Sequence, residues 1–304
     1  MVTQHEYSHS QAEFDELHGL LRESYAIAGR PHDWLFARLE NWKYANAAKA
    51  REDPGFFARN VHLWRGQGSR LIGFCISEYG TKGIELQVHP QHRGVEGDMV
   101  GWILEEWGRG KEAVEVCACT EDIERQSLLA RLGFREAGDD GYMRQYDVTR
   151  DYPALPLDPG FRVSTLAEAG NDEERMAVEA ATFPHVGLDR EWFDGKASAP
   201  SYSADWDFVV VTPEGRYAAF CLAWLDRGNR VAEVDPVGTH PDFRRRGLAR
   251  AVITECFRRL RAAGIERAYI SSAPEPAVSN RLYESLAPTA RYLWRRWVKE
   301  SQPR

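Results

Sequence analysis

The chain has 304 residues, of which 43% are hydrophobic, 12% aromatic and 28% charged, and these proportions exclude collagen-like, disulfide-scaffold and disordered proteins. Its formal net charge of −7 repels phosphate backbones, which disfavours nucleic acid as the main partner. A length of about two typical domains is enough to bury sizeable cores.

The sequence predicts a cytoplasmic chain that crosses no membrane and holds no metal. Its apolar runs, such as residues 208–211, are far shorter than the ~18 residues that span a bilayer. The first residues carry neither the basic nor the apolar region of an export signal. Five cysteines, an odd number, favour buried reduced thiols. Cys117 and Cys119 have no second Cys or His pair at zinc spacing.

The first half begins with helical patterns, and no strand can be assigned before Val61. An alternating apolar run at 84–89 then leads through Pro90 and a basic turn at 91–94 into a helical stretch at 99–104. The elements expected after it are a strand at 114–118, an amphipathic helix near 123–132 and a closing strand at 142–148.

A proline-rich segment separates the two halves. Residues 151–160 contain three prolines and a glycine, which break both helix and strand patterns. The pattern therefore predicts a domain of residues 1–150, a linker at 151–159 and a second domain at 160–304.

The second half repeats the order of the first. Pro90 aligns with Pro241 at a shift of 151 residues, and the closing strands align at a shift of 150, which indicates duplication of one domain. Strands followed by a strand-helix-strand-helix-strand finish predict an α/β fold with a mixed sheet and helices on both faces. The elements expected here are strands near 161–166, 208–211, 217–225, 234–239, 267–271 and 292–298, and helices near 172–182, 252–260 and 278–286.

The turn at 244–249 has the features of a polyanion site. Unpaired backbone N–H groups converge where a strand passes through a glycine turn into a helix, and the helix dipole favours negative charge there. Gly247 and Ala249 leave room for a phosphate to approach the main chain, and the arginines add charge. A solvated, arginine-rich helix start is the alternative interpretation.

The order of these features resembles the GNAT superfamily of acyl-CoA-dependent N-acyltransferases. The Arg-x-x-Gly-x-Ala turn, the long helix and strand after it, and the helix at 280–286 carry the resemblance, which covers residues 160–300. It implies two tandem GNAT-like domains with mixed, splayed sheets, and acyl-CoA bound between parting strands. The residues implied to hold the acyl-CoA pyrophosphate are Arg244, Arg245, Arg246, Gly247, Leu248, Ala249 and Arg250, and those along the pantetheine are Val237, Gly238 and Thr239.

Residues 70–148 look like a second, degenerate copy. In its turn at 93–98, Glu96 and Asp98 stand where the second half has small residues. Carboxylates directed at a pyrophosphate would repel it, so no acyl-CoA is expected in this half. An alternative alignment makes Gly97 the glycine of the turn.

The resemblance also assigns the proton-transfer residues. In this family a carboxylate on the strand before the turn often acts as base, and Glu233 matches that position. Tyr283 matches the tyrosine that donates a proton to the CoA sulfur, and Asn280 lies on the same helical face, where it would contact pantetheine. An arginine-paired structural carboxylate is the alternative for Glu233. Asp235 shares its side-chain parity on the strand.

The first copy differs from the second half at two of these positions, and the second half differs from the family pattern at one. The first copy has Lys82 opposite Glu233 and Leu129 in place of Tyr283. The Gly-Phe pair that usually follows this helix is kept in the first half, whereas the second half has Ala287 and Pro288.

These observations predict a tandem N-acetyltransferase that uses acetyl-CoA as donor and a small-molecule or peptide amine as acceptor. Two alternatives stay open. One is a non-catalytic protein that binds and senses acyl-CoA. The other is a small-thiol acetyltransferase similar to mycothiol synthase. The acidic charge disfavours the aminoacyl-tRNA-using branch of the superfamily.

Overall fold

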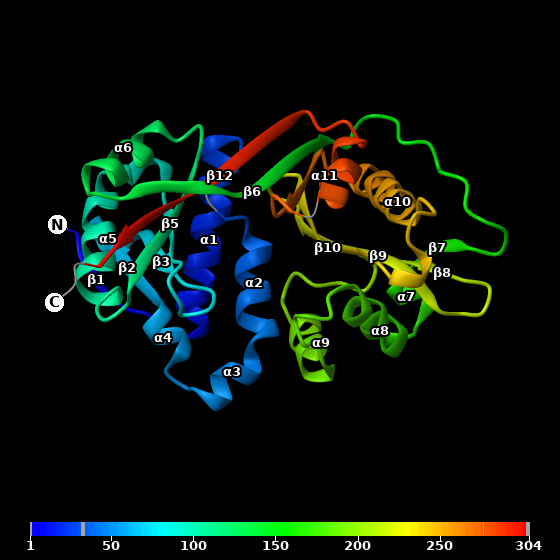
Figure 1. Ribbon diagram of the computed structural model, residues 1–304, viewed down its shortest axis with the longest axis horizontal. Coiled ribbons are helices and arrows are strands. Elements are labelled where there is room, and N and C mark those ends of the chain that lie inside the picture. The colour runs from blue at the N-terminus through cyan, green and yellow to red at the C-terminus, as the bar shows by residue number, and fades with distance from the viewer. Residues whose placement is uncertain (1, 32–33, 276, 302–304) are drawn as a thin grey trace. The chain divides into compact units, whose positions relative to one another are not determined.

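The structure is a computed structural model that describes residues 2–31, 34–275 and 277–301 (Figure 1). The chain forms two compact units, each assembled from separate stretches of sequence. Unit 1 consists of Met1–Trp42, Ala48–Tyr142 and Tyr292–Arg304, and unit 2 consists of Lys43–Ala47 and Met143–Arg291. The division of the chain at residues 151–159 stays a prediction.

Unit 1 contains an antiparallel sheet in the order β1-β2-β3-β4, and β5 that pairs antiparallel with β12. β1 was not expected, because its four residues TQHE are polar and only pairing with β2 makes them a strand. The elements of the first half of the chain are β1 (Thr3–Glu6), α1 (Gln11–Ala28), α2 (Phe36–Ala45), α3 (Ala47–Glu52), α4 (Phe56–Asn60), β2 (Val61–Arg65), β3 (Leu71–Ile76), β4 (Glu85–Val88), α5 (Glu96–Trp102), β5 (Ala113–Cys119), α6 (Ile123–Arg131) and β6 (Arg135–Asp147).

Unit 2 contains a mixed sheet in the order β6-β11-β10-β9-β8-β7. The pairs from β7 to β10 are antiparallel, and β10 with β11 is parallel. The elements of the second half of the chain are β7 (Arg162–Thr165), α7 (Leu166–Ala169), α8 (Asp172–Thr182), α9 (Arg190–Ala197), β8 (Asp207–Val211), β9 (Tyr217–Asp226), β10 (Val231–Thr239), α10 (Leu248–Ala262), β11 (Arg267–Ser272), α11 (Ala277–Glu284) and β12 (Ala290–Glu300).

Helices cover both faces of the unit 2 sheet, which confirms the predicted fold class. Successive residues of β8 point to opposite faces, so Phe208 and Val210 pack in the core beneath α10, while Val209 and Val211 pack in a second core with α8 and α9. The fully buried strands read as nearly continuous apolar runs for this reason.

Buried charges fasten α8 and α9 to the sheet. Arg175 on α8 donates to Asp207 on β8 and to Glu179, both at 2.7 Å. Lys196 on α9 donates to the same Glu179 oxygen at 2.7 Å. All four side chains are buried, and their two positive and two negative charges compensate one another. Removal of any one of them would leave an uncompensated charge in a low-dielectric interior, which is destabilising.

The closing strand of each sequence half lies in the unit built mainly by the other half. From Tyr292 onward, β12 belongs to unit 1, where it pairs with β5 from Trp294 opposite Cys119 to Glu300 opposite Ala113. Residues 143–147 of β6 belong to unit 2, where β6 lies beside β11.

Within the residues that the structure describes, no helix is both long and apolar enough to cross a membrane.

Candidate active site

A gap opens in the unit 2 sheet where β10 and β11 part. Their parallel pairing covers only Val231, Ala232 and Glu233, whereas β10 continues to Thr239 in contact with β9. An irregularity between Val234 and Val237 lies at the point of separation. Beyond Glu233, the edge of β10 that faces away from β9 is therefore a strand edge, which can pair with an extended ligand.

The predicted turn follows directly on this edge. A short 3-10 helix at Pro241–Phe243 is capped by the His240 ring, and α10 begins after Gly247. Arg245 and Gly247 have φ values of 64° and 75°, in the left-handed region. Alternating left-handed residues turn successive N–H groups toward one side, and the first N–H groups of α10 have no partner inside the helix. The turn therefore has the backbone geometry of an anion-binding concavity at a helix N-terminus, and pyrophosphate binding there stays a prediction.

Two arginine side chains of the turn contact other parts of the protein. Arg246 forms an ion pair with Asp158 and lies over the Phe161 ring at 4.5 Å, so it fastens residues 151–159 to the turn. The Arg244 side chain donates to the Thr239 carbonyl at 3.3 Å. At Gly238 a Cβ would approach the Phe220 ring to 2.5 Å, so close packing alone requires this glycine.

Glu233 and Tyr283 lie on opposite faces of β10. Ala232 and Val234 point into the core beneath α10, so Glu233 between them points to the other face. Glu233 is 6% exposed. Tyr283 on α11 is 7% exposed and packs in the same core as Val234. The two candidate proton-transfer groups therefore flank the sheet at the point where β10 and β11 part.

The surroundings of Tyr283 keep its phenol protonated. Burial and the negative charge of Asp235 raise the pKa of Tyr283 above its ordinary value, and the Arg144 guanidinium opposes this shift. Asp235 itself is exposed, and its carbonyl accepts a 2.7 Å bond from the Trp224 indole. A neutral phenol is a proton donor, as the predicted role requires.

Asn280 has its amide committed inside the protein. Its Nδ2 donates to the carbonyls of Ala273 and Pro274 at 3.1 and 2.8 Å. Its Oδ1 accepts from Arg144 at 2.9 Å and from Ser272 at 2.8 Å. Both donors and both acceptor positions are thereby used, so Asn280 anchors α11. Contact between Asn280 and pantetheine stays a prediction.

The turn of unit 1 is filled by its own carboxylate. Instead of projecting outward as expected, Glu96 is 2% exposed and forms ion pairs with Arg93 and Arg125, the latter at 3.0 Å. Arg93 also donates to both Asp122 oxygens at 2.9 Å. Burial would raise the pKa of Asp122, but the charge of Arg125 and the bond from Arg93 outweigh it and lower that pKa. The arginines that a pyrophosphate would need are therefore already neutralised.

Three other positions of unit 1 were singled out by the sequence comparison. Gly97 lies inside α5, so the alternative alignment that makes it the turn glycine is wrong. Lys82 forms an ion pair with Glu115 at 2.7 Å, and Leu129 is a fully buried core residue.

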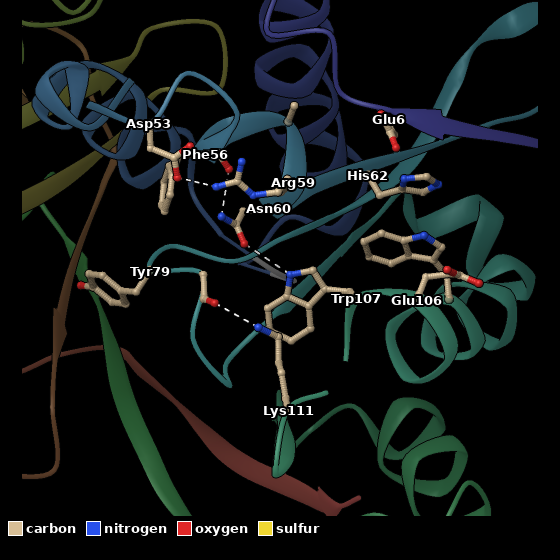
Figure 2. A pocket seen from close by; sticks show the side chains of 13 residues that line it. Glu6, Asp53, Phe56, Arg59, Asn60, His62, Tyr79, Glu106, Trp107 and Lys111 are labelled. Atoms are coloured by element: carbon tan, nitrogen blue, oxygen red, sulfur yellow. Dashed lines mark hydrogen bonds and ion pairs between the residues drawn. The ribbon is translucent and has the colours of Figure 1, made fainter. Parts of the chain in front are cut away.

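A cavity of about 590 Å³ lies elsewhere in unit 1 (Figure 2). Two of its polar side chains bond to each other or to the backbone, because Trp107 donates to Asn60 at 3.3 Å and Lys111 to the Gly80 carbonyl at 3.1 Å. Burial, with the charge of His5, lowers the pKa of His62 to about 4, so its imidazole is neutral at physiological pH. Residues of the turn at 90–98 do not line this cavity.

Sequence reasoning missed the residues that hold α11. Arg144 and Tyr146 lie on β6, beyond the sequence boundaries of the predicted second domain, and Glu284 follows Tyr283. Alternation along β6 predicts a strand but not the element that it will contact. In the described part of the chain, no group of three or more His, Cys, Asp or Glu side chains is arranged to hold a metal ion.

Residues 173–287 match the Acetyltransferase (GNAT) family. Among curated relatives, a mycothiol acetyltransferase from Thermobispora bispora is 30% identical over 244 residues, covering 72% of this chain and 77% of the relative. One from Saccharomonospora viridis is 27% identical over 249 residues, covering 74% and 80%.

Two solved structures share the fold over the whole chain. A tandem GNAT protein from the clavulanic acid biosynthesis pathway has a TM-score of 0.67 at 13% identity and covers 100% of both chains. A GCN5-related N-acetyltransferase from Sphaerobacter thermophilus has a TM-score of 0.63 at 17% identity, covering 99% of this chain and 96% of the other.

Proposed function

The chain belongs to the GNAT family of acetyltransferases and is an acyltransferase, and from this premise we propose that it transfers the acetyl group of acetyl-CoA to a primary amine by direct attack. The observation that supports this most is the gap between β10 and β11, with an anion-binding turn at one end and Glu233 and Tyr283 on its two faces. Acetyl-CoA in this gap would have its pyrophosphate at the turn and its thioester between the two side chains.

The proposed step balances with these two residues. Glu233 takes a proton from the amine, and the freed lone pair attacks the thioester carbonyl. A C–N bond forms and the C–S bond breaks. The nitrogen of the adduct loses its second proton to solvent as the C–S bond breaks. Tyr283 gives its proton to the departing sulfur on the other face of the sheet, and its phenolate regains a proton from solvent. The products are the N-acetylated amine, free CoA and one proton, which Glu233 releases to solvent. Because base and acid lie on opposite faces of the sheet, the amine would approach the thioester from the face that carries Glu233.

Titration of acetyl-CoA into the wild-type protein and the Gly247→Glu variant tests the binding site. We expect one site per chain, and an affinity about 100-fold weaker in the variant, because the carboxylate opposes the pyrophosphate. Nothing lies within 4 Å of a Cβ at Gly247, so the added cost is charge and left-handed strain. Gly247→Asn is the matched control, since asparagine tolerates this conformation without charge. Two sites would mean that unit 1 also binds, and no binding would refute the proposal.

The acceptor has one favoured candidate. The curated relatives named above are mycothiol acetyltransferases. We therefore propose that the acceptor is the amine group of a small thiol compound similar to non-acetylated mycothiol. Release of CoA is to be measured with the non-acetylated form of mycothiol, a lysine peptide, a polyamine and an aminoglycoside. We expect fastest turnover with the first. Faster turnover with another amine would overturn this candidate, and acetyl-CoA binding without turnover would favour a sensing role.

A further inference from the structure

One guanidinium holds the helix that carries Tyr283. Arg144 on β6 is 4% exposed, and its Nε donates to Glu284 at 2.7 Å, Nη1 to Ser272 at 2.8 Å and Nη2 to Asn280 at 2.9 Å. Asn280 and Glu284 are one turn apart on α11, and Ser272 ends β11. Each of the three guanidinium nitrogens thus donates to α11 or to the strand beside it.

Tyr146, two residues further along β6, holds the same helix at a second point. Its hydroxyl donates to the backbone carbonyl of Tyr283 at 3.0 Å, and its ring packs against Phe257 with centroids 5.2 Å apart. α11 is only eight residues long, so its position depends on tertiary contacts. β6 supplies two of these contacts, one from Arg144 and one from Tyr146.

The Arg144 charge also lies close to the phenol. The guanidinium carbon is 5.9 Å from the Tyr283 ring centroid. When a buried tyrosine gives up its proton, the phenolate that forms is costly in a low dielectric, and a nearby cation lowers that cost. The same cation opposes the effect of burial and of Asp235 on the pKa of Tyr283.

We infer that Arg144 is a positioning residue for Tyr283: it orients α11 so that the phenolic O–H reaches the departing sulfur, and its charge stabilises the phenolate left behind. The inference rests on the proposed function of Tyr283 as proton donor. It goes beyond that function, because it assigns a role in transfer to a strand that precedes the linker and belongs to the degenerate copy by sequence.

A double-mutant cycle with Arg144→Met and Tyr283→Phe tests the inference. Turnover is to be measured with acetyl-CoA and the fastest amine of the panel described above. We expect Tyr283→Phe to lower kcat about 100-fold and Arg144→Met about 10-fold, with the KM for acetyl-CoA within about twofold of wild type. The double variant should equal Tyr283→Phe, because Arg144 has nothing to position once the hydroxyl is gone.

Two further variants and one spectroscopic measurement separate positioning from general stability. Arg144→Lys keeps the charge but not the fork, and should recover part of the loss while folding as wild type. Arg135→Met removes an exposed arginine from the same strand, paired with Glu300, and should leave kcat unchanged. In ¹³C-tyrosine-labelled protein, the Tyr283 ring resonance, identified by its absence from Tyr283→Phe, should shift in Arg144→Met and not in Arg135→Met. This readout needs no acceptor.

The outcomes are distinct. If the double variant is slower than Tyr283→Phe by the full effect of Arg144→Met, Arg144 acts independently of the tyrosine and the inference is wrong. An unmoved Tyr283 resonance in Arg144→Met overturns it as well. Wild-type turnover in Tyr283→Phe overturns the proposed acid, and this inference with it, whereas the additive result leaves the proposed function intact.

Discussion

Replacement of Glu233 by glutamine is expected to lower kcat by about 10²- to 10⁴-fold, the range that a positioned base contributes. Glutamine keeps the size of the side chain but cannot accept the proton of an ammonium group. The acetyl-CoA affinity should stay within about twofold of wild type, because Glu233 lies before the strand edge that would hold the pantetheine. Turnover of the variant should rise with pH up to the pKa of the amine, as solvent takes over deprotonation.

Two controls make this result interpretable. Asp235→Asn removes the other carboxylate of β10, and a larger loss there than in Glu233→Gln would identify Asp235 as the base. Glu214→Gln alters an exposed turn between β8 and β9 and should have no effect on kcat. Wild-type turnover in Glu233→Gln would leave Glu233 as a structural carboxylate.

Replacement of Glu96 by glutamine is expected to lower the free energy of unfolding of unit 1 by about 3 kcal/mol, at the lower end of the range for breaking a buried ion pair. Arg125 is 2% exposed and would lose its principal counter-charge. Asp122 remains near both arginines, which limits the loss. Urea unfolding followed by tryptophan fluorescence measures the change.

The matched control for this prediction is Glu121→Gln, which breaks an ion pair with Arg30 that is largely exposed on both sides. It should alter stability by less than about 0.5 kcal/mol. Combining Glu96→Gln with Arg125→Met should recover stability, since the uncompensated charge is then absent. An equal effect of both glutamine variants would mean that the cluster around Glu96 contributes no more than a surface pair.

The parts of the site that sequence predicted are those set by local chemistry. The turn at 244–249 is readable because Gly247 needs a left-handed conformation and the arginines and helix start adjoin it in sequence. The roles of Glu233 and Tyr283 come from the family resemblance and stay predictions. The left-handed conformation of Arg245 is not, because a non-glycine residue gives no signal for it.

The parts that were missed depend on contacts between distant segments. Arg144 is one of many arginines on alternating strands, and only the placement of β6 beside β11 brings it to α11. The inward direction of Glu96 depends on Arg125, 29 residues away. From sequence, a carboxylate at the position of Glu96 predicts that a pyrophosphate is repelled. The sequence does not predict that the carboxylate turns inward and binds the arginines itself.

The exchange of closing strands makes each unit depend on residues from both halves of the sequence. A deletion of the gene segment for residues 1–150 would remove Arg144 and Tyr146, and with them the support of α11. A deletion after residue 291 would remove most of β12, the strand that pairs antiparallel with β5. Neither half of the sequence contains all the strands of the unit that it mainly builds, so the chain is expected to fold as one polypeptide and not as two separable domains.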